Sequence, residues 1–166
     1  MNYLELIKKE CFEESPYFKD EIDFLKSLFI ERNYFDIIII APQLMEKIAY
    51  EIDECYDQYL TRKMGEPSEE EKEVHSLYSR VIKEESTKAR VAKILIDLYQ
   101  NEHFDCSFSR NEFIKYFTKL ENIISCRNHL AHDFYKIQIS KKRIKQVANE
   151  AIELIELLAY YPGLGY

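Results

Sequence analysis

Apolar residues recur every three or four positions along most of this chain, which is the period of an amphipathic α-helix. The most regular stretch lies near the end, where the apolar row from Ile144 to Ala159 stops before Pro162. The pattern predicts helices over residues 3–14, 19–32, 34–63, 68–101 with an interruption near 84–87, from 109 onwards, and 140–161. Residues predicted to face inward include Ile22, Leu25, Phe29 and Ile30 in the second helix, and Val74, Leu77, Val81, Leu95, Ile96 and Tyr99 in the fourth.

The segment 34–63 has two interpretations. Its four consecutive isoleucines, at 37–40, would suit a short buried strand, and Pro42 interrupts a regular helix. Beyond Pro42, however, Leu44, Ile48 and Ile52 return to helical spacing, and no partner strand is evident elsewhere. We therefore predict a helix that is kinked near Pro42.

Two serines mark helix starts. Ser68 and Ser109 are each followed three residues later by a glutamate, which is the pattern of a capping box. Breakers are scarce, with three glycines and four prolines in 166 residues. These features predict an all-α fold, a bundle of five or six helices forming one domain over residues 1–166.

Residues 125–135 hold the densest group of reactive side chains. Arg127, Asn128, His129 and His132 lie within six positions, although the chain has only four histidines. Arg127 also follows Leu120 by seven residues, so an unbroken helix would place the guanidinium almost in line with a buried row. Because an unpaired buried charge is costly, this face should end in a polar pocket, a cleft or a subunit interface.

The six residues from Arg127 to His132, R-N-H-L-A-H, resemble the R-x4-6-H motif of the HEPN superfamily. Members of this superfamily are small all-helical domains, and many are metal-independent endoribonucleases of prokaryotic defence, CRISPR-associated and toxin-antitoxin systems. The resemblance implies that Arg127 and His132 are catalytic and that Asn128 supports them. It also implies a composite active site at a homodimer interface.

The residue types suit RNA cleavage on chemical grounds as well. RNA supplies its own nucleophile in the 2′-hydroxyl, so cleavage needs a base, an acid and a cation for the phosphorane. Histidine titrates near neutrality, and arginine holds phosphate oxygens with two donors. Neither a metal nor another cofactor is required, and the expected products carry 2′,3′-cyclic phosphate and 5′-hydroxyl ends.

Helix geometry complicates a site made by one chain. Arg127 and His132 are five residues apart and project about 140° apart on a regular helix, whereas Asn128 and His132 share a face. Either the helix breaks near His129, or a second chain completes the site. In-line displacement needs groups on both sides of phosphorus, which favours a two-fold homodimer.

The distribution of charge bears on an RNA substrate. The net charge is −7, but residues 110–145 carry nine Lys or Arg against three acids, a net of +6, which leaves −13 on the remainder. Single-stranded RNA is therefore expected to bind near the motif, through His129, Lys136, Lys141, Lys142 and Arg143. His129 also fits a plain surface histidine. The last three cations also fit a solvated face, opposite Glu150, Glu153 and Glu156 on the same helix.

A different class of function is also open. The chain would then be a non-catalytic HEPN-like binding or dimerisation module, the partner or regulator of another protein such as a nucleotidyltransferase antitoxin. Some toxins of this superfamily carry a modifiable tyrosine two residues after the motif histidine, but here Phe134 holds that position and Tyr135 follows.

The remaining sequence features point to a cytoplasmic protein without a membrane segment. Acidic residues interrupt the N-terminal region before a signal sequence could form, and the longest apolar run, 37–41, is too short to span a bilayer. The four cysteines include no C-x-x-C pair and are expected to be reduced thiols. His103 with Cys106 and His129 with His132 form isolated pairs, so no metal site is predicted.

Overall fold

The computed structural model describes residues 18–62, 65–100, 109–132 and 139–160. Within these ranges the chain forms six α-helices and no strand, which confirms the all-α prediction. The predicted first helix, over residues 3–14, lies outside the described residues. The helices are α2 (Lys19–Ile30), α3 (Tyr34–Arg62), α4 (Glu69–Glu84), α5 (Thr87–Gln100), α6 (Arg110–His132) and α7 (Lys141–Tyr160).

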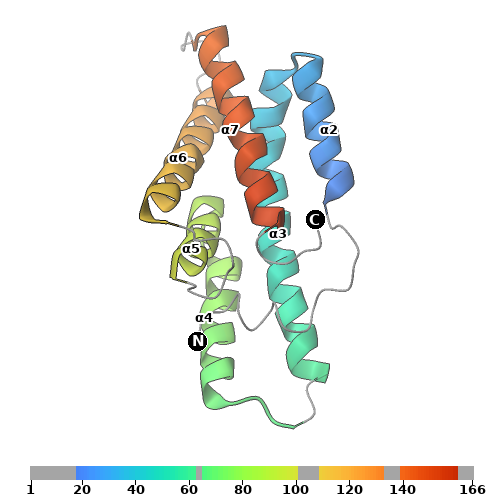
Figure 1. Ribbon diagram of the computed structural model, residues 1–166, viewed down its shortest axis with the longest axis vertical. Helices are drawn as coiled ribbons and strands as arrows, with labels where there is room; N and C mark the ends of the chain where they lie inside the picture. Colours follow the sequence, from blue (N-terminus) through green and yellow to red (C-terminus); the bar gives the residue numbers. More distant parts are fainter. Residues whose placement is uncertain (1–17, 63–64, 101–108, 133–138, 161–166) are drawn as a thin grey trace.

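Helix α3 is the longest element and spans the length of the molecule (Figure 1). It packs against α2, α4, α5, α6 and α7, so each of the other helices lies on it. It continues as one helix through Pro42 and includes the four isoleucines, so the alternative of a buried strand is wrong. The core includes buried rows on α3 and α7, two helices that pack against each other, among them Ile38, Met45, Ile48 and Ile52 on α3 and Val147, Ala151, Ile155 and Leu158 on α7.

The helix starts follow the predicted chemistry. Ser68 Oγ accepts the Glu71 N–H at 3.1 Å, while the Glu71 carboxylate accepts the Ser68 N–H at 2.8 Å. Ser109 and Glu112 form the same pair of bonds at 3.2 and 2.9 Å, and Ser140 Oγ accepts the Arg143 N–H at 3.1 Å. Both capping boxes are confirmed, and they fix where α4 and α6 begin.

Several predicted inward positions are wrong. The exposed residues are Ile30, Leu77, Ile96 and Tyr99. The helical structure is interrupted at residues 85–86, between α4 and α5, so each of the two helices can rotate about its own axis independently of the other. As a result, α4 buries Tyr78 and Ile82 and not Leu77. Ile30 is the final residue of α2, where the chain already turns towards α3.

The turn between α2 and α3 has an unusual residue at its left-handed backbone position. The Asn33 N–H donates to the Leu28 carbonyl at 2.8 Å and the Arg32 N–H to the Phe29 carbonyl at 3.1 Å, which is the pattern of a Schellman motif. Arg32 holds the left-handed position of this motif with φ 64°, where glycine is usual. A side chain in this conformation costs about 1–2 kcal/mol. The turn therefore carries an arginine at a backbone position that favours glycine.

None of the described helices is long and apolar enough to cross a bilayer.

Candidate functional site

The motif residues lie on the last turns of α6, which continues without a break to His132. The predicted alternative of a break near His129 is therefore wrong. Arg127 and His132 project about 140° apart on this regular helix, whereas Asn128 and His132 lie one turn apart on one face. A single chain does not bring the guanidinium and the His132 imidazole together from the same side of α6.

The structure does connect the first two motif residues. Arg127 Nη1 donates a hydrogen bond to Asn128 Oδ1 at 3.0 Å. Both side chains are exposed, as are His129 and His132. The bond restrains a flexible guanidinium and leaves its other donors open to solvent, where they can meet an anionic group.

Arg127 continues the direction of a buried row onto an uncovered surface. Arg127 follows Leu120 by seven residues and Ala131 follows Leu120 by eleven, so both project within about 20° of Leu120 on a regular helix. Leu120 is fully buried, whereas Arg127 and Ala131 are exposed. In the described part of the chain, the cover over Leu120 thus does not extend to this end of α6.

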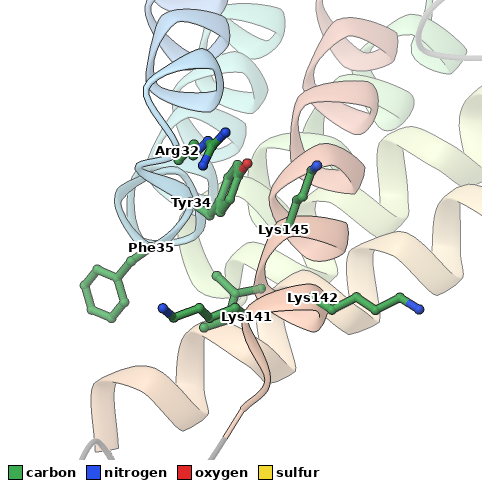
Figure 2. A pocket seen from close by; sticks show the side chains of 7 residues that line it. Arg32, Tyr34, Phe35, Lys141, Lys142 and Lys145 are labelled. Carbon is green, nitrogen blue, oxygen red and sulfur yellow. The ribbon is translucent and has the colours of Figure 1, made fainter.

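Lys141 and Lys142 line an open cleft of about 740 Å³, which we call the basic cleft (Figure 2). Its lining consists of Arg32, Tyr34, Phe35, Lys141, Lys142, Ile144 and Lys145. One wall is the turn between α2 and α3 with the first two residues of α3, and the other is the first turn and a half of α7. The turn between α2 and α3, the end of α6 and the start of α7 all lie at the same end of the bundle (Figure 1).

His129 and Arg143 line a different hollow, a crevice of about 260 Å³ between α6 and α7. Ser125, Cys126, Asn122 and Ile139 complete its lining. The predicted RNA-binding residues are therefore divided between two places, and Lys136 lies outside the described residues. Burial raises the pKa of the Cys126 thiol despite the opposing charge of Arg143, so Cys126 is a poor nucleophile here.

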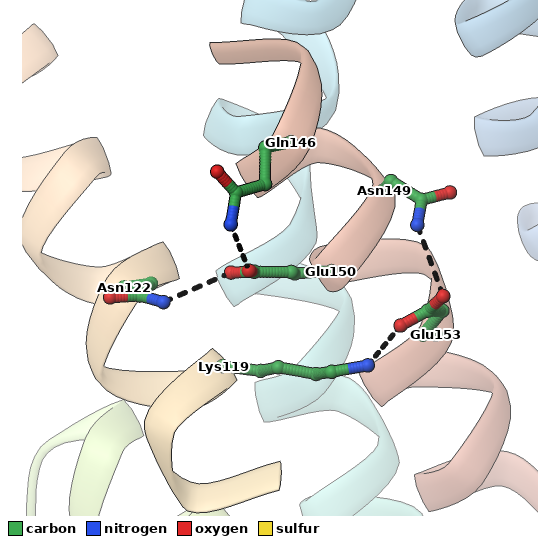
Figure 3. A network of polar contacts seen from close by, with 6 residues as sticks. All are labelled: Lys119, Asn122, Gln146, Asn149, Glu150 and Glu153. Carbon is green, nitrogen blue, oxygen red and sulfur yellow. Dashed lines mark hydrogen bonds and ion pairs between the residues drawn. The ribbon is translucent and has the colours of Figure 1, made fainter. Parts of the chain in front are cut away.

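Asn122, which lines the crevice, also belongs to a network of polar contacts between α6 and α7 (Figure 3). Asn122 donates to Glu150 at 3.1 Å, and Glu150 also accepts from Gln146 at 3.0 Å. Lys119 forms an ion pair with Glu153, which holds the pKa of that carboxyl below its usual value. Glu150 and Glu153 of α7 thus bind neighbouring side chains, although Glu153 remains exposed.

Sequence reasoning missed a cluster of Asp53, His75 and Ser79 between α3 and α4. Ser79 Oγ donates to Asp53 Oδ1 at 2.5 Å, and His75 Nε2 lies 3.3 Å from the same oxygen and 3.1 Å from Ser79 Oγ. A serine nucleophile must give its proton to a histidine that the carboxylate orients. Here the serine donates to the carboxylate and one histidine nitrogen faces both partners. The cluster therefore ties two helices together and does not form a catalytic triad.

Among the residues that the structure describes, no three His, Cys, Asp or Glu side chains are grouped closely enough to hold a metal ion. The predicted pair of His103 and Cys106 lies outside the described residues.

Comparison of the chain with protein-family models, with curated proteins and with solved structures finds no match. The interpretation of the site therefore rests on its own residues, their geometry and the resemblance of the motif.

Proposed function

We propose that the chain is a metal-independent endoribonuclease of the HEPN type, which cuts single-stranded RNA at a composite site in a homodimer. The observation that carries the proposal is the exposed end of α6. There Arg127 is hydrogen-bonded to Asn128, and His132 follows Asn128 by one turn on the same face.

Each residue has a chemical task in this mechanism. A base removes the proton from the 2′-hydroxyl, and the 2′-oxygen attacks the adjacent phosphorus. The bond from phosphorus to the 5′-oxygen then breaks, and an acid returns a proton to the leaving oxygen. His132 provides an imidazole that can accept or donate a proton, and Arg127 stabilises the charge on the phosphorane oxygens, with Asn128 holding its guanidinium.

A second copy of the chain supplies what one chain lacks. One His132 cannot lie both behind the attacking oxygen and beside the leaving oxygen, because these are on opposite sides of phosphorus. Two-fold pairing through the uncovered face of Arg127 and Ala131 would bring two copies of the motif to one cleft. The two guanidiniums would repel each other there, and a bound phosphate would offset that repulsion.

The first test is cleavage of end-labelled single-stranded RNA in excess EDTA. We expect the unaltered protein to cut it and leave cyclic phosphate ends, and Arg127→Ala to reduce the rate by at least about a hundredfold. Arg80→Ala is the matched control, since Arg80 is an exposed arginine on α4. Cleavage by Arg127→Ala at the unaltered rate would refute the assignment of the site.

The second candidate is a non-catalytic binding module, and the divergence of Arg127 and His132 on a single α6 favours it. In that case the dimer would form and present the same surface to a protein partner such as a nucleotidyltransferase. Absence of cleavage by the unaltered protein over several RNAs, with a dimer present in solution, would favour this candidate.

A further inference from the structure

The basic cleft has an unbalanced charge. Four of its seven lining residues are cations, Arg32, Lys141, Lys142 and Lys145, and none is an acid. None of the four forms an ion pair with any residue that the structure describes. Along the sides of the bundle, by contrast, lysines pair with acids of other helices, as Lys88 does with Glu121 at 3.1 Å.

The lining also includes two aromatic residues, Tyr34 and Phe35, at the start of α3. Tyr34 packs against Phe29 with 5.0 Å between ring centroids, so its ring is held in place. Figure 2 shows the Tyr34 hydroxyl between the ends of Arg32 and Lys145, while Lys141 extends towards Phe35. Phe35 as a whole residue is 39% exposed. Cations that follow a backbone and a ring that can stack on a base are the two features shared by surfaces that bind single strands.

Two properties argue against an ordinary solvated surface. The cleft volume, about 740 Å³, lies within the range of ligand sites. Arg32 also holds a left-handed backbone position that glycine would fill without strain. Two acids, Glu31 and Asp36, flank the lining residues 32–35 in the sequence, but both are exposed and neither lines the cleft. Glu31 instead accepts a hydrogen bond from Asn33 at 3.3 Å.

We propose that the basic cleft binds the backbone of single-stranded RNA and that Phe35 stacks on one of its bases. The inference rests on the proposed ribonuclease function and adds to it the place where the strand lies. The helix ends that form the cleft and the C-terminal end of α6, which carries the motif, lie at the same end of the bundle (Figure 1), so one strand could contact both.

The test measures binding without cleavage, by fluorescence anisotropy of a labelled 2′-O-methyl oligouridylate, which has no free 2′-hydroxyl to react. The test variant combines Arg32→Gly, Lys141→Gln and Lys145→Gln. We expect its Kd to rise at least about tenfold and the slope of log Kd against log salt to fall by about 2, since each lost phosphate contact on a single strand contributes about 0.7. Arg32→Gly also relieves the left-handed strain, so unfolding is not the expected cause.

The matched control removes the same charge elsewhere, through Arg80→Gln, Lys83→Gln and Arg110→Gln, all at exposed positions. It should change the Kd less than about threefold, which is the effect of net charge alone. Equal weakening by both triple variants, or no binding by the unaltered protein, would overturn the proposal.

A second measurement separates base stacking from charge. Phe35→Leu keeps apolar bulk but removes the aromatic face, and should weaken oligouridylate binding about tenfold without changing binding of inorganic polyphosphate. Phe24→Leu on α2 is the control, because Phe24 is also an exposed ring. Equal affinity of Phe35→Leu and the unaltered protein for oligouridylate would refute stacking. Binding through the cleft without cleavage by the unaltered protein would support the cleft and refute the ribonuclease.

Discussion

The contact between α3 and α4 gives a prediction whose size follows from the structure. Ser79→Ala removes the 2.5 Å hydrogen bond to Asp53, whose side chain is only 10% exposed. A hydrogen bond to a charged group contributes about 1.5–3 kcal/mol. His75 still faces the same carboxylate oxygen at 3.3 Å, so the loss should lie near the lower end, about 1.5–2 kcal/mol.

The assay is urea unfolding followed by helical circular dichroism, because the chain has no tryptophan to report by fluorescence. Ser79→Ala should lower the urea midpoint without changing the slope, and lower Tm by about 3–8 °C. Ser76→Ala is the matched control, since Ser76 is an exposed serine on the same helix, and it should stay within about 0.5 kcal/mol of the unaltered protein.

Acid provides an independent check of the same bond. Burial alone raises the pKa of Asp53, but hydrogen bonds from His75 and Ser79, together with the charges of His75 and Lys83, outweigh it, and the pKa falls below its ordinary value of 3.8. A lowered pKa in the folded state means that the stabilisation is present above the unfolded pKa and is lost as the pH falls through the folded pKa. The difference between Ser79→Ala and the unaltered protein should therefore be constant near neutral pH and shrink below pH 3.8. Equal stability of Ser79→Ala and Ser76→Ala at pH 7, or a difference that grows in acid, would refute the reasoning.

Three further predictions concern α4 and α6. Ser68→Ala should destabilise the fold by about 1 kcal/mol in urea unfolding, because the Glu71 N–H at the start of α4 loses its acceptor; no loss would contradict the capping box. If both copies of His132 serve one cleft, refolding the unaltered chain with an equal amount of His132→Ala should leave about one quarter of the cleavage activity, and one half would mean that each chain works alone. Ala131→Glu places bulk and charge on the uncovered face beside Arg127, and sedimentation should show more monomer with unchanged helical content; an intact dimer would move the interface elsewhere.

Features of the fold that depend on neighbouring residues could be predicted from the sequence. Both capping boxes join residues three apart, and the apolar row of α7 is fixed by helical spacing alone. The rotation of α4 about its axis could not be predicted, because it depends on contacts with a distant helix, such as the hydrogen bond that the Tyr78 hydroxyl donates to the Ala49 carbonyl on α3. Apolar residues also lie on the exposed side of α4 and α5, so their pattern does not distinguish the two faces.

Contacts between distant residues could not be predicted from the sequence either. Arg90 is buried against Glu46, 44 residues away, and its guanidinium lies 5.2 Å from the centre of the Tyr50 ring. The sequence around Arg90 does not indicate that Glu46 is its partner, and the sequence around Glu46 does not indicate Arg90. For the candidate site, helical spacing predicted that Arg127 projects in the same direction as Leu120, and α6 is unbroken as this requires. The exposure of Arg127 could not be predicted, because it depends on how far the neighbouring helices extend. The basic cleft was only half predicted, since its second wall comes from Arg32, Tyr34 and Phe35.

The division of charge over the bundle explains why one end is suited to an anionic ligand. Acidic residues on the sides are used between helices, as in the pairs of Glu156 with Lys26 and Glu153 with Lys119. The start of α7 carries cations although a helix N-terminus favours acids, so these cations lower the stability of the helix when nothing is bound. A phosphate backbone lying across this end would neutralise them and also face the positive end of the α7 dipole. The arrangement is unfavourable for an isolated helix and favourable for a strand-binding surface, and salt-dependent binding through the basic cleft is the property that separates these two cases.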